Sequence, residues 1–203
     1  MKTRLLVVLC FLPFGAFCQK QYFSLFPDSF AASGDTSNES IVIQYPGRTA
    51  AQLYSAIRSV LPSVFQTTKY QESHVKDQTI SVHWDVEGSV PLKTSFGEYK
   101  KECFFSPTMV WHIKDGKIKI DAPQAIPLKG TNSNVEGDFT LFLSKKTKKD
   151  DPEGPPKTDI YMFEFDGSVN KRTINVKAAL ESEINTFVGK VLEGMDKEMN
   201  VDW

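Results

Sequence analysis

The middle of the chain alternates apolar and polar residues with a period of two, the pattern of a strand with one buried face. Ile80, Val82 and Trp84 alternate with polar neighbours in a strand that we expect over 79–86. Asp115-Gly116 predicts a tight hairpin in which both turn residues have positive φ. Other runs of β-branched and aromatic residues predict strands at 41–45, 70–75, 98–105, 109–113, 118–120, 139–143 and 160–165.

Two segments repeat their apolar residues at steps of three and four, which predicts helices. The first runs from Ala50 to Phe65, follows the N-cap candidate Thr49, and contains Pro62, where we expect a kink or a break. The second carries one apolar stripe from Val176 to Met195, with lysines and glutamates on its other faces.

The order of elements is therefore strand, helix, several strands, helix. Strands joined by tight turns run antiparallel, because a parallel pair needs a long crossover. Two helices with one apolar stripe each, beside a sheet with one apolar face, predict the α+β class. We expect a two-layer sandwich, a mostly antiparallel sheet with two long helices packed on one face, in a single domain over 41–203.

The N-terminus has the three parts of a secretory signal peptide over 1–18. Lys2 and Arg4 precede the apolar run Leu5–Leu12, and Ala16-Phe17-Cys18 places small residues at −3 and −1 of a cleavage site. The apolar run is shorter than the ~20 residues of a spanning helix. We expect a secreted or periplasmic protein of the cell envelope. The alternatives are a lipid anchor on Cys18 or an uncleaved segment.

Residues 19–40 follow the leader and read as an N-terminal arm or tether, since their aromatic start gives way to a small, polar stretch. Composition is that of a globular chain, with 40% hydrophobic residues and 15 Phe, enough for a core. Loss of the leader changes the formal net charge from −1 to −3, which gives no general attraction for nucleic acid or anionic lipid. Only Cys103 is certain to remain, which excludes a disulfide scaffold.

The strand at Ile41–Tyr45, the phrase Leu53-Tyr54-Ser55-Ala56, and the run from Tyr70 to Ile120 ending in the 110–120 hairpin together resemble one family. It is a secreted bacterial family of unknown function with a fold similar to the TATA-binding protein. The resemblance covers roughly Ile41 to Ala122, and the chain departs from it near Val90–Phe96 and after Pro123. It implies a TATA-binding-protein-like fold and brings no catalytic residues. It does not imply DNA binding, because function belongs to sites rather than folds.

Candidate chemistry is sparse. His74 and His83 would share a sheet face if the turn between them is tight, and a zinc or copper ion would then need a third ligand such as Glu72. Solvent-facing histidines are the simpler interpretation, so we predict no metal and no cofactor. Cys103 sits among bulky apolar neighbours, which favours a buried thiol over a nucleophile. Asp85 and Glu87 share a strand face but have no predicted cleft.

Trp84 and Trp111 fit either a stacking face for sugars or peptides, or the core. The run 145–149 is basic but is followed at once by acidic residues, which predicts a solvated hairpin tip rather than an anion-binding patch. The leading hypothesis is a non-enzymatic binding or interaction module for an unknown protein or small ligand. The alternatives are a hydrolase acting on envelope polymers or glycans, and an accessory subunit of an envelope complex. The candidates for ligand contact are His74, His83, Asp85, Trp111 and His112.

Overall fold

A computed structural model gives the fold. The structure describes residues 20–66, 69–94, 97–124, 128–130, 139–146 and 160–200. Within these ranges the side chains of 87–94, 97–104, 128–130, 139–141 and 144 are not described. The leader, Cys18, the side chains of Glu87 and Cys103, and most of the basic run 145–149 therefore lie outside the described residues.

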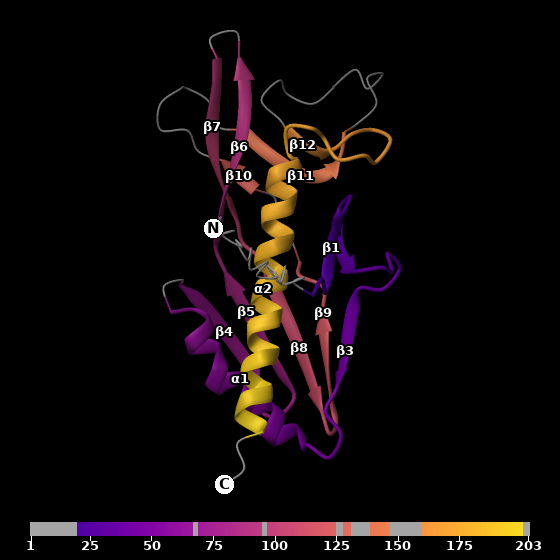
Figure 1. The fold of residues 1–203 in the computed structure, drawn as a ribbon, viewed down its shortest axis with the longest axis vertical. Coiled ribbons are helices and arrows are strands. Elements are labelled where there is room, and N and C mark those ends of the chain that lie inside the picture. The colour runs from indigo at the N-terminus through magenta and orange to yellow at the C-terminus, as the bar shows by residue number, and fades with distance from the viewer. Residues whose placement is uncertain are drawn as a thin grey trace, which may run out of the picture.

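The larger part of the core lies under an antiparallel sheet of five strands (Figure 1). Its spatial order is β3-β9-β8-β5-β4, so β3 and β4 form its two edges. Every neighbouring pair in this sheet is antiparallel. The strands are β3 (Ser40–Gln44), β4 (Tyr70–Val75), β5 (Thr79–Trp84), β8 (Thr108–Lys114) and β9 (Lys117–Asp121).

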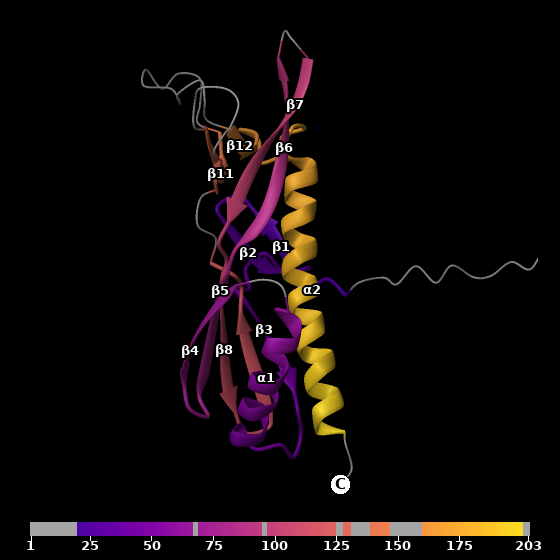
Figure 2. The same ribbon diagram turned by 90° about the vertical axis from the view of Figure 1, so that its left-hand side faces the viewer.

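Two helices, α1 (Ala50–Val64) and α2 (Ile174–Met199), cover one face of this sheet and leave the other uncovered (Figure 2). The apolar phase of each strand points to the helices: Ile80, Val82 and Trp84 of β5 are all buried. The expected α+β sandwich, a mostly antiparallel sheet with two long helices on one face, is confirmed for these five strands.

α1 begins with the capping box that Thr49 predicted. The Thr49 side chain accepts from the backbone N–H of Gln52, and the Gln52 side chain accepts from the backbone N–H of Thr49. The helix continues through Pro62 and ends at Val64, so the expected break does not occur. Pro62 stands in the last turn and removes one i→i−4 hydrogen bond there, close to where the helix ends in any case.

The β8–β9 turn anchors the start of α1. Gly116 has φ 74, but Asp115 is not in the left-handed region, so the expectation of positive φ at both turn residues is wrong. Instead, Asp115 Oδ1 accepts from the backbone N–H of Ala50 at 2.7 Å. This contact places a carboxylate at the positive end of the α1 dipole.

A second sheet was not predicted. Its order is β12-β11-β10-β7-β6, with β11 and β12 parallel and its other pairs antiparallel. The expected hairpin with its tip at 145–149 is therefore wrong, because β11 and β12, on either side of it, run in the same direction and need a crossover. The strands are β6 (Val86–Thr94), β7 (Gly97–Phe105), β10 (Leu128–Gly130), β11 (Phe139–Lys145) and β12 (Ile160–Phe163).

The segment expected to be an arm or tether contains a β-hairpin, β1 (Phe23–Phe26) with β2 (Ser29–Ala32). Phe23, Leu25 and Phe30 belong to the main core and are at most 2% exposed. Asp28 has φ 76 at the turn, and its backbone N–H donates to the carbonyl of Leu143 in β11. The interpretation of this stretch as a loosely held arm is therefore wrong.

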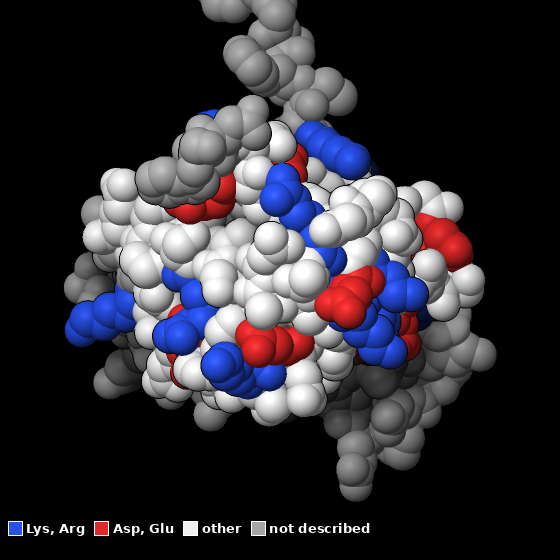
Figure 3. All heavy atoms as spheres, turned by 90° about the horizontal axis from the view of Figure 1, so that it is seen from below, with Lys and Arg blue, Asp and Glu red and all other residues white. Residues whose placement is uncertain are grey.

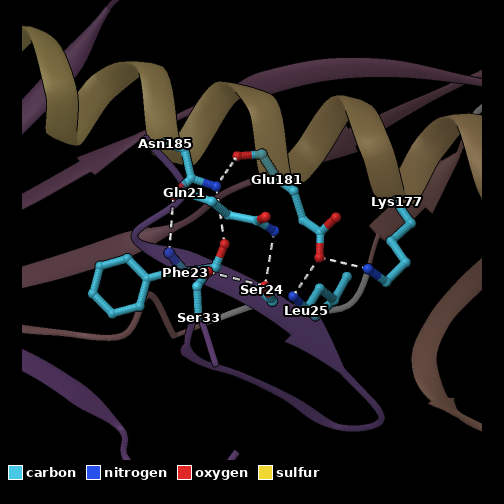
Figure 4. Close-up of polar contacts among 8 residues, drawn as sticks. All are labelled: Gln21, Phe23, Ser24, Leu25, Ser33, Lys177, Glu181 and Asn185. Carbon is cyan, nitrogen blue, oxygen red and sulfur yellow. Dashed lines mark hydrogen bonds and ion pairs between the residues drawn. The ribbon is translucent and has the colours of Figure 1, made fainter. Parts of the chain in front are cut away.

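Side chains of α2 take the place of a partner strand for the outer edge of β1 (Figure 4). Asn185 Oδ1 accepts from the backbone N–H of Phe23, and Asn185 Nδ2 donates to the Phe23 carbonyl, both at 2.9 Å. Glu181 Oε1 accepts from the backbone N–H of Leu25 at 2.7 Å. Glu181 and Asn185 are four residues apart on the helix, a rise of ~6 Å, and the strand residues that they contact are two apart, ~6.6 Å. The two spacings therefore match.

Candidate functional site

The uncovered face of the five-stranded sheet presents the polar phase of every strand. Register places Thr79 beside His112, His112 beside Lys119, and Lys119 beside Val42. Residues that pair directly across an antiparallel sheet share one face, so these side chains form a row across four strands. We call this surface the open face. It is a candidate site because neither helix covers it.

A shallow hollow of about 350 Å³ lies on the open face over β3, β9 and β8. We call it the basic hollow. Its lining consists of one apolar residue, one histidine and three lysines: Val42, His112, Lys114, Lys117 and Lys119. Val42 is 51% exposed, an unusual position for a valine in a strand.

Asp121 fixes the side chains at one end of the basic hollow. Its Oδ2 lies 2.7 Å from His112 Nε2, and its Oδ1 lies 2.8 Å from Lys119 Nζ. Burial acts to raise the pKa of Asp121, but the hydrogen bonds from Lys119 and His112, together with their charge, hold the pKa below its ordinary value. Asp121 therefore stays ionised and offsets the charge of Lys119.

Lys114 and Lys117 face each other across the β8–β9 pair. Within the described part of the chain, neither has an acidic group within ion-pair distance. Their ammonium groups are thus available to an external anion. Asp121 orients the imidazole of His112 at the solvent-exposed surface of the hollow, where the two side chains are 42% and 33% exposed. The arrangement is suited to holding negative charge.

A second hollow of about 450 Å³ adjoins the first and shares Lys119 with it. Three carboxylates line this one, those of Asp28, Glu39 and Asp121, against the single lysine. The open face is therefore polar along its length, basic toward the β8–β9 turn and acidic toward the β1–β2 hairpin. Of these two hollows, the basic hollow is the one that favours an anionic partner.

The charges of the whole molecule do not produce this difference. Seen from the end where the β8–β9 turn and the start of α1 lie, basic and acidic side chains alternate around an uncharged centre (Figure 3). With a formal net charge of −1, the chain has no overall attraction for anions. Any such attraction must come from the local group of lysines.

Two of the sequence-predicted candidates lie beside the open face, away from the basic hollow. His83 Nδ1 lies 2.9 Å from Thr108 Oγ1, its register partner on β8. Asp85 Oδ1 accepts from the hydroxyl of Ser106 at 2.6 Å. Each group already has a polar partner in a neighbouring segment, and of the predicted residues only His112 lines the hollow.

His74 and His83 do not share a sheet face, so that expectation is wrong. His74 pairs with the buried Ile80, which places it on the helix side, against the ring of Tyr54 and 3.3 Å from Glu72. Three residues, 76–78, form the turn between β4 and β5, so Val75 pairs with Thr79. In this register the two histidines lie on opposite faces of the sheet. Among the described residues, no three histidine, cysteine or acidic side chains form a group that could hold a metal ion.

Trp111 is fully buried, so its proposed role in ligand contact is wrong. Phe187 of α2 packs edge-on against it, and Trp84 and Phe65 pack around the same phenylalanine ring. The apolar phase of β5 and β8 points toward the helices, which is why these tryptophans fill the core rather than a stacking face.

Within the residues that the structure describes, no helix is long and apolar enough to span a membrane.

Comparison of the structure with solved structures supports the fold. The chain is similar to a TBP-like protein from Parabacteroides distasonis, with 12% identity and a TM-score of 0.50, over 77% of this chain and 90% of that one. The fold is TBP-like. A DUF4468 family protein from Bacteroides ovatus matches at 11% identity and a TM-score of 0.46, over 77% and 84% of the two chains. No family model and no curated protein matches the sequence. The fold that the sequence resemblance implied is confirmed.

Proposed function

We propose that the mature chain is an exported, non-catalytic binding module that holds an anionic partner on its open face. The observation that carries the proposal is the basic hollow. Three lysines and a histidine converge there on an exposed valine, on the face of the sheet that neither helix covers. Two of the lysines, Lys114 and Lys117, have no acidic neighbour within ion-pair distance among the described residues.

The exposure of the site sets the kind of partner. An ion pair at a solvated surface contributes only ~0.2–1 kcal/mol, so one small anion would bind too weakly to matter. Several such contacts made by one chain add up, because the later contacts are intramolecular. The proposal therefore favours a polymer with repeated negative charges and some apolar surface to cover Val42.

Binding of poly-L-glutamate and of a polyuronate, measured by isothermal titration calorimetry, tests the proposal. We expect binding that weakens as salt is raised and that falls about tenfold in K114Q/K117Q, about the effect of losing two exposed ion pairs. The control K190Q/K197Q removes the same charge from α2, on the covered face, and should bind as the unmodified chain does. Failure of both polymers to bind at low salt would refute the proposal.

Export is the second part of the proposal, and it rests on the leader pattern in 1–18. Intact mass spectrometry of protein produced with its leader in a bacterial host tests it. Cleavage before Gln19 gives the mass of the chain from 19 onward, whereas lipidation adds a diacylglycerol to Cys18. Recovery of the full-length chain from the cytoplasm would contradict export.

A further inference from the structure

One edge of the sheet beside the basic hollow has unpaired backbone groups. Tyr45 donates to Gly116, and Ala122 donates to Glu39, so the odd-numbered residues of β3 bond to β9. Val42 lies between two of those residues, so its N–H and C=O point outward. Among the described residues, the outward groups of Val42 and Gln44 have no partner. In Figure 1, β3 forms the outer margin of the sheet.

β3 also lacks the features that normally protect a strand edge. Natural edges carry charged side chains, proline or bulges that stop another strand from pairing with them. β3 reads Ser-Ile-Val-Ile-Gln, with no charge and no proline, and Val42 is 51% exposed on the open face. The other edge, β4, contains Glu72 bound to Arg58 at 2.9 Å. The two edges are therefore not equivalent.

The basic hollow lies within reach of a strand added at this edge. Such a strand would run two strand spacings from β9, ~9.6 Å, a distance that a lysine and a glutamate side chain can bridge together. Lys117 and Lys119 are two residues apart on β9, so ~6.8 Å separates them along the strand. Alternate residues of an extended peptide have the same spacing, and Val42 lies between the two rows.

We infer that the anionic partner is an acidic polypeptide segment that adds to the free edge of β3 as a strand. Its backbone pairs with Val42 and Gln44, and its same-face carboxylates meet Lys117, Lys119 and, across β9, Lys114. The inference rests on the proposed function and deepens it. A second copy of this chain fits the edge less well, because two β3 strands side by side would bring two groups of lysines toward each other.

The test uses a short peptide that alternates glutamate and threonine, measured by titration calorimetry against the chain without its leader. Two probes of the same charge accompany it: the same peptide N-methylated at every residue, which has no N–H left to pair along either edge, and a polyuronate, which has no peptide backbone. We expect the unmodified peptide to bind about tenfold more tightly than the N-methylated one, the effect of losing two or so hydrogen bonds.

The variant V42P removes the outward N–H without removing any β3–β9 hydrogen bond, and V42T keeps it. V42P should lose about tenfold in affinity for the peptide and nothing for the polyuronate, and V42T should lose neither. The intrinsic fluorescence of the buried Trp84 and Trp111 reports whether each variant is folded. The N-methylated peptide gives the same test without changing the protein.

The outcomes separate the two proposals. Equal binding of both peptides and the polyuronate, with V42P unchanged, overturns strand addition and leaves anion binding intact. Self-association of the chain that V42P abolishes would assign the edge to a second copy and overturn the inference. Failure of every anionic probe to bind overturns the proposed function itself.

Discussion

Replacing Asn185 with alanine removes the side chain that satisfies the outer edge of β1. Asn185 is 4% exposed, and its amide pairs with both the N–H and the C=O of Phe23, which is fully buried (Figure 4). It also accepts from the backbone N–H of Tyr22. In N185A these groups lose their partner while remaining under α2, where water does not reach them freely.

The cost follows from the number of groups that lose a partner. A buried backbone group without a hydrogen bond costs ~1–3 kcal/mol, so two groups on Phe23 destabilise the fold by about 2–4 kcal/mol after partial relaxation. In a chain of this size each kcal/mol lowers Tm by ~2–4 °C, which gives a fall of about 5–15 °C. The Tyr22 contact is only part-buried and adds little.

Urea unfolding followed by tryptophan fluorescence measures this cost, because Trp84 and Trp111 lie in the same core cluster as Phe23. E183A, an exposed substitution on the same helix, is the control and should stay within ~0.5 kcal/mol of the unmodified chain. An N185A variant as stable as this control would refute the view that α2 side chains replace a strand beside β1.

Three further changes test other contacts. In G194A, a Cβ would lie 2.5 Å from a methyl group of Val60, so we expect the free energy of unfolding in urea to fall by ~1–3 kcal/mol. V60A should relieve this loss in a double-mutant cycle. Strictly additive effects of the two substitutions would contradict the clash. D115A should cost ~1 kcal/mol because the first turn of α1 loses its carboxylate cap; unchanged stability would show that the contact is dispensable. The pKa of Asp121 is lowered in the fold, so its contribution to stability is present above the unfolded pKa of ~3.9 and is lost as pH falls through the lower folded value. Carboxyl NMR titration should give a higher midpoint in H112Q, and an unchanged midpoint would show that His112 does not hold the carboxylate ionised.

Much of the main sheet and both helices could be predicted from the sequence, because their apolar periods are long and regular. The predicted helix over 50–65 is α1 (Ala50–Val64), and the strand expected over 70–75 is β4. The β1–β2 hairpin was missed because each strand has only four residues, and contacts with α2 stabilise it. The alternation in Phe23-Ser24-Leu25-Phe26, followed by Pro27-Asp28, was the available signal.

The candidate site was only partly accessible from the sequence. His112 was named, but the basic hollow depends on which residues of β3, β8 and β9 lie beside each other. Strand register decides which side chains meet. In the sequence, lysines that recur along a hairpin look the same whether or not their side chains gather at one place on the sheet. Trp111 was named for its chemistry, although its phase along β8 is the buried one, shared with Met109 and Ile113.

Backbone amide NMR during titration with the alternating glutamate–threonine peptide shows most directly where an anion binds. The account predicts shifts concentrated on β3, β9 and β8, at Val42, Lys117, Lys119 and His112, with the amides of α2 unmoved. Shifts confined to α1 and α2, or spread evenly over the surface, would contradict it.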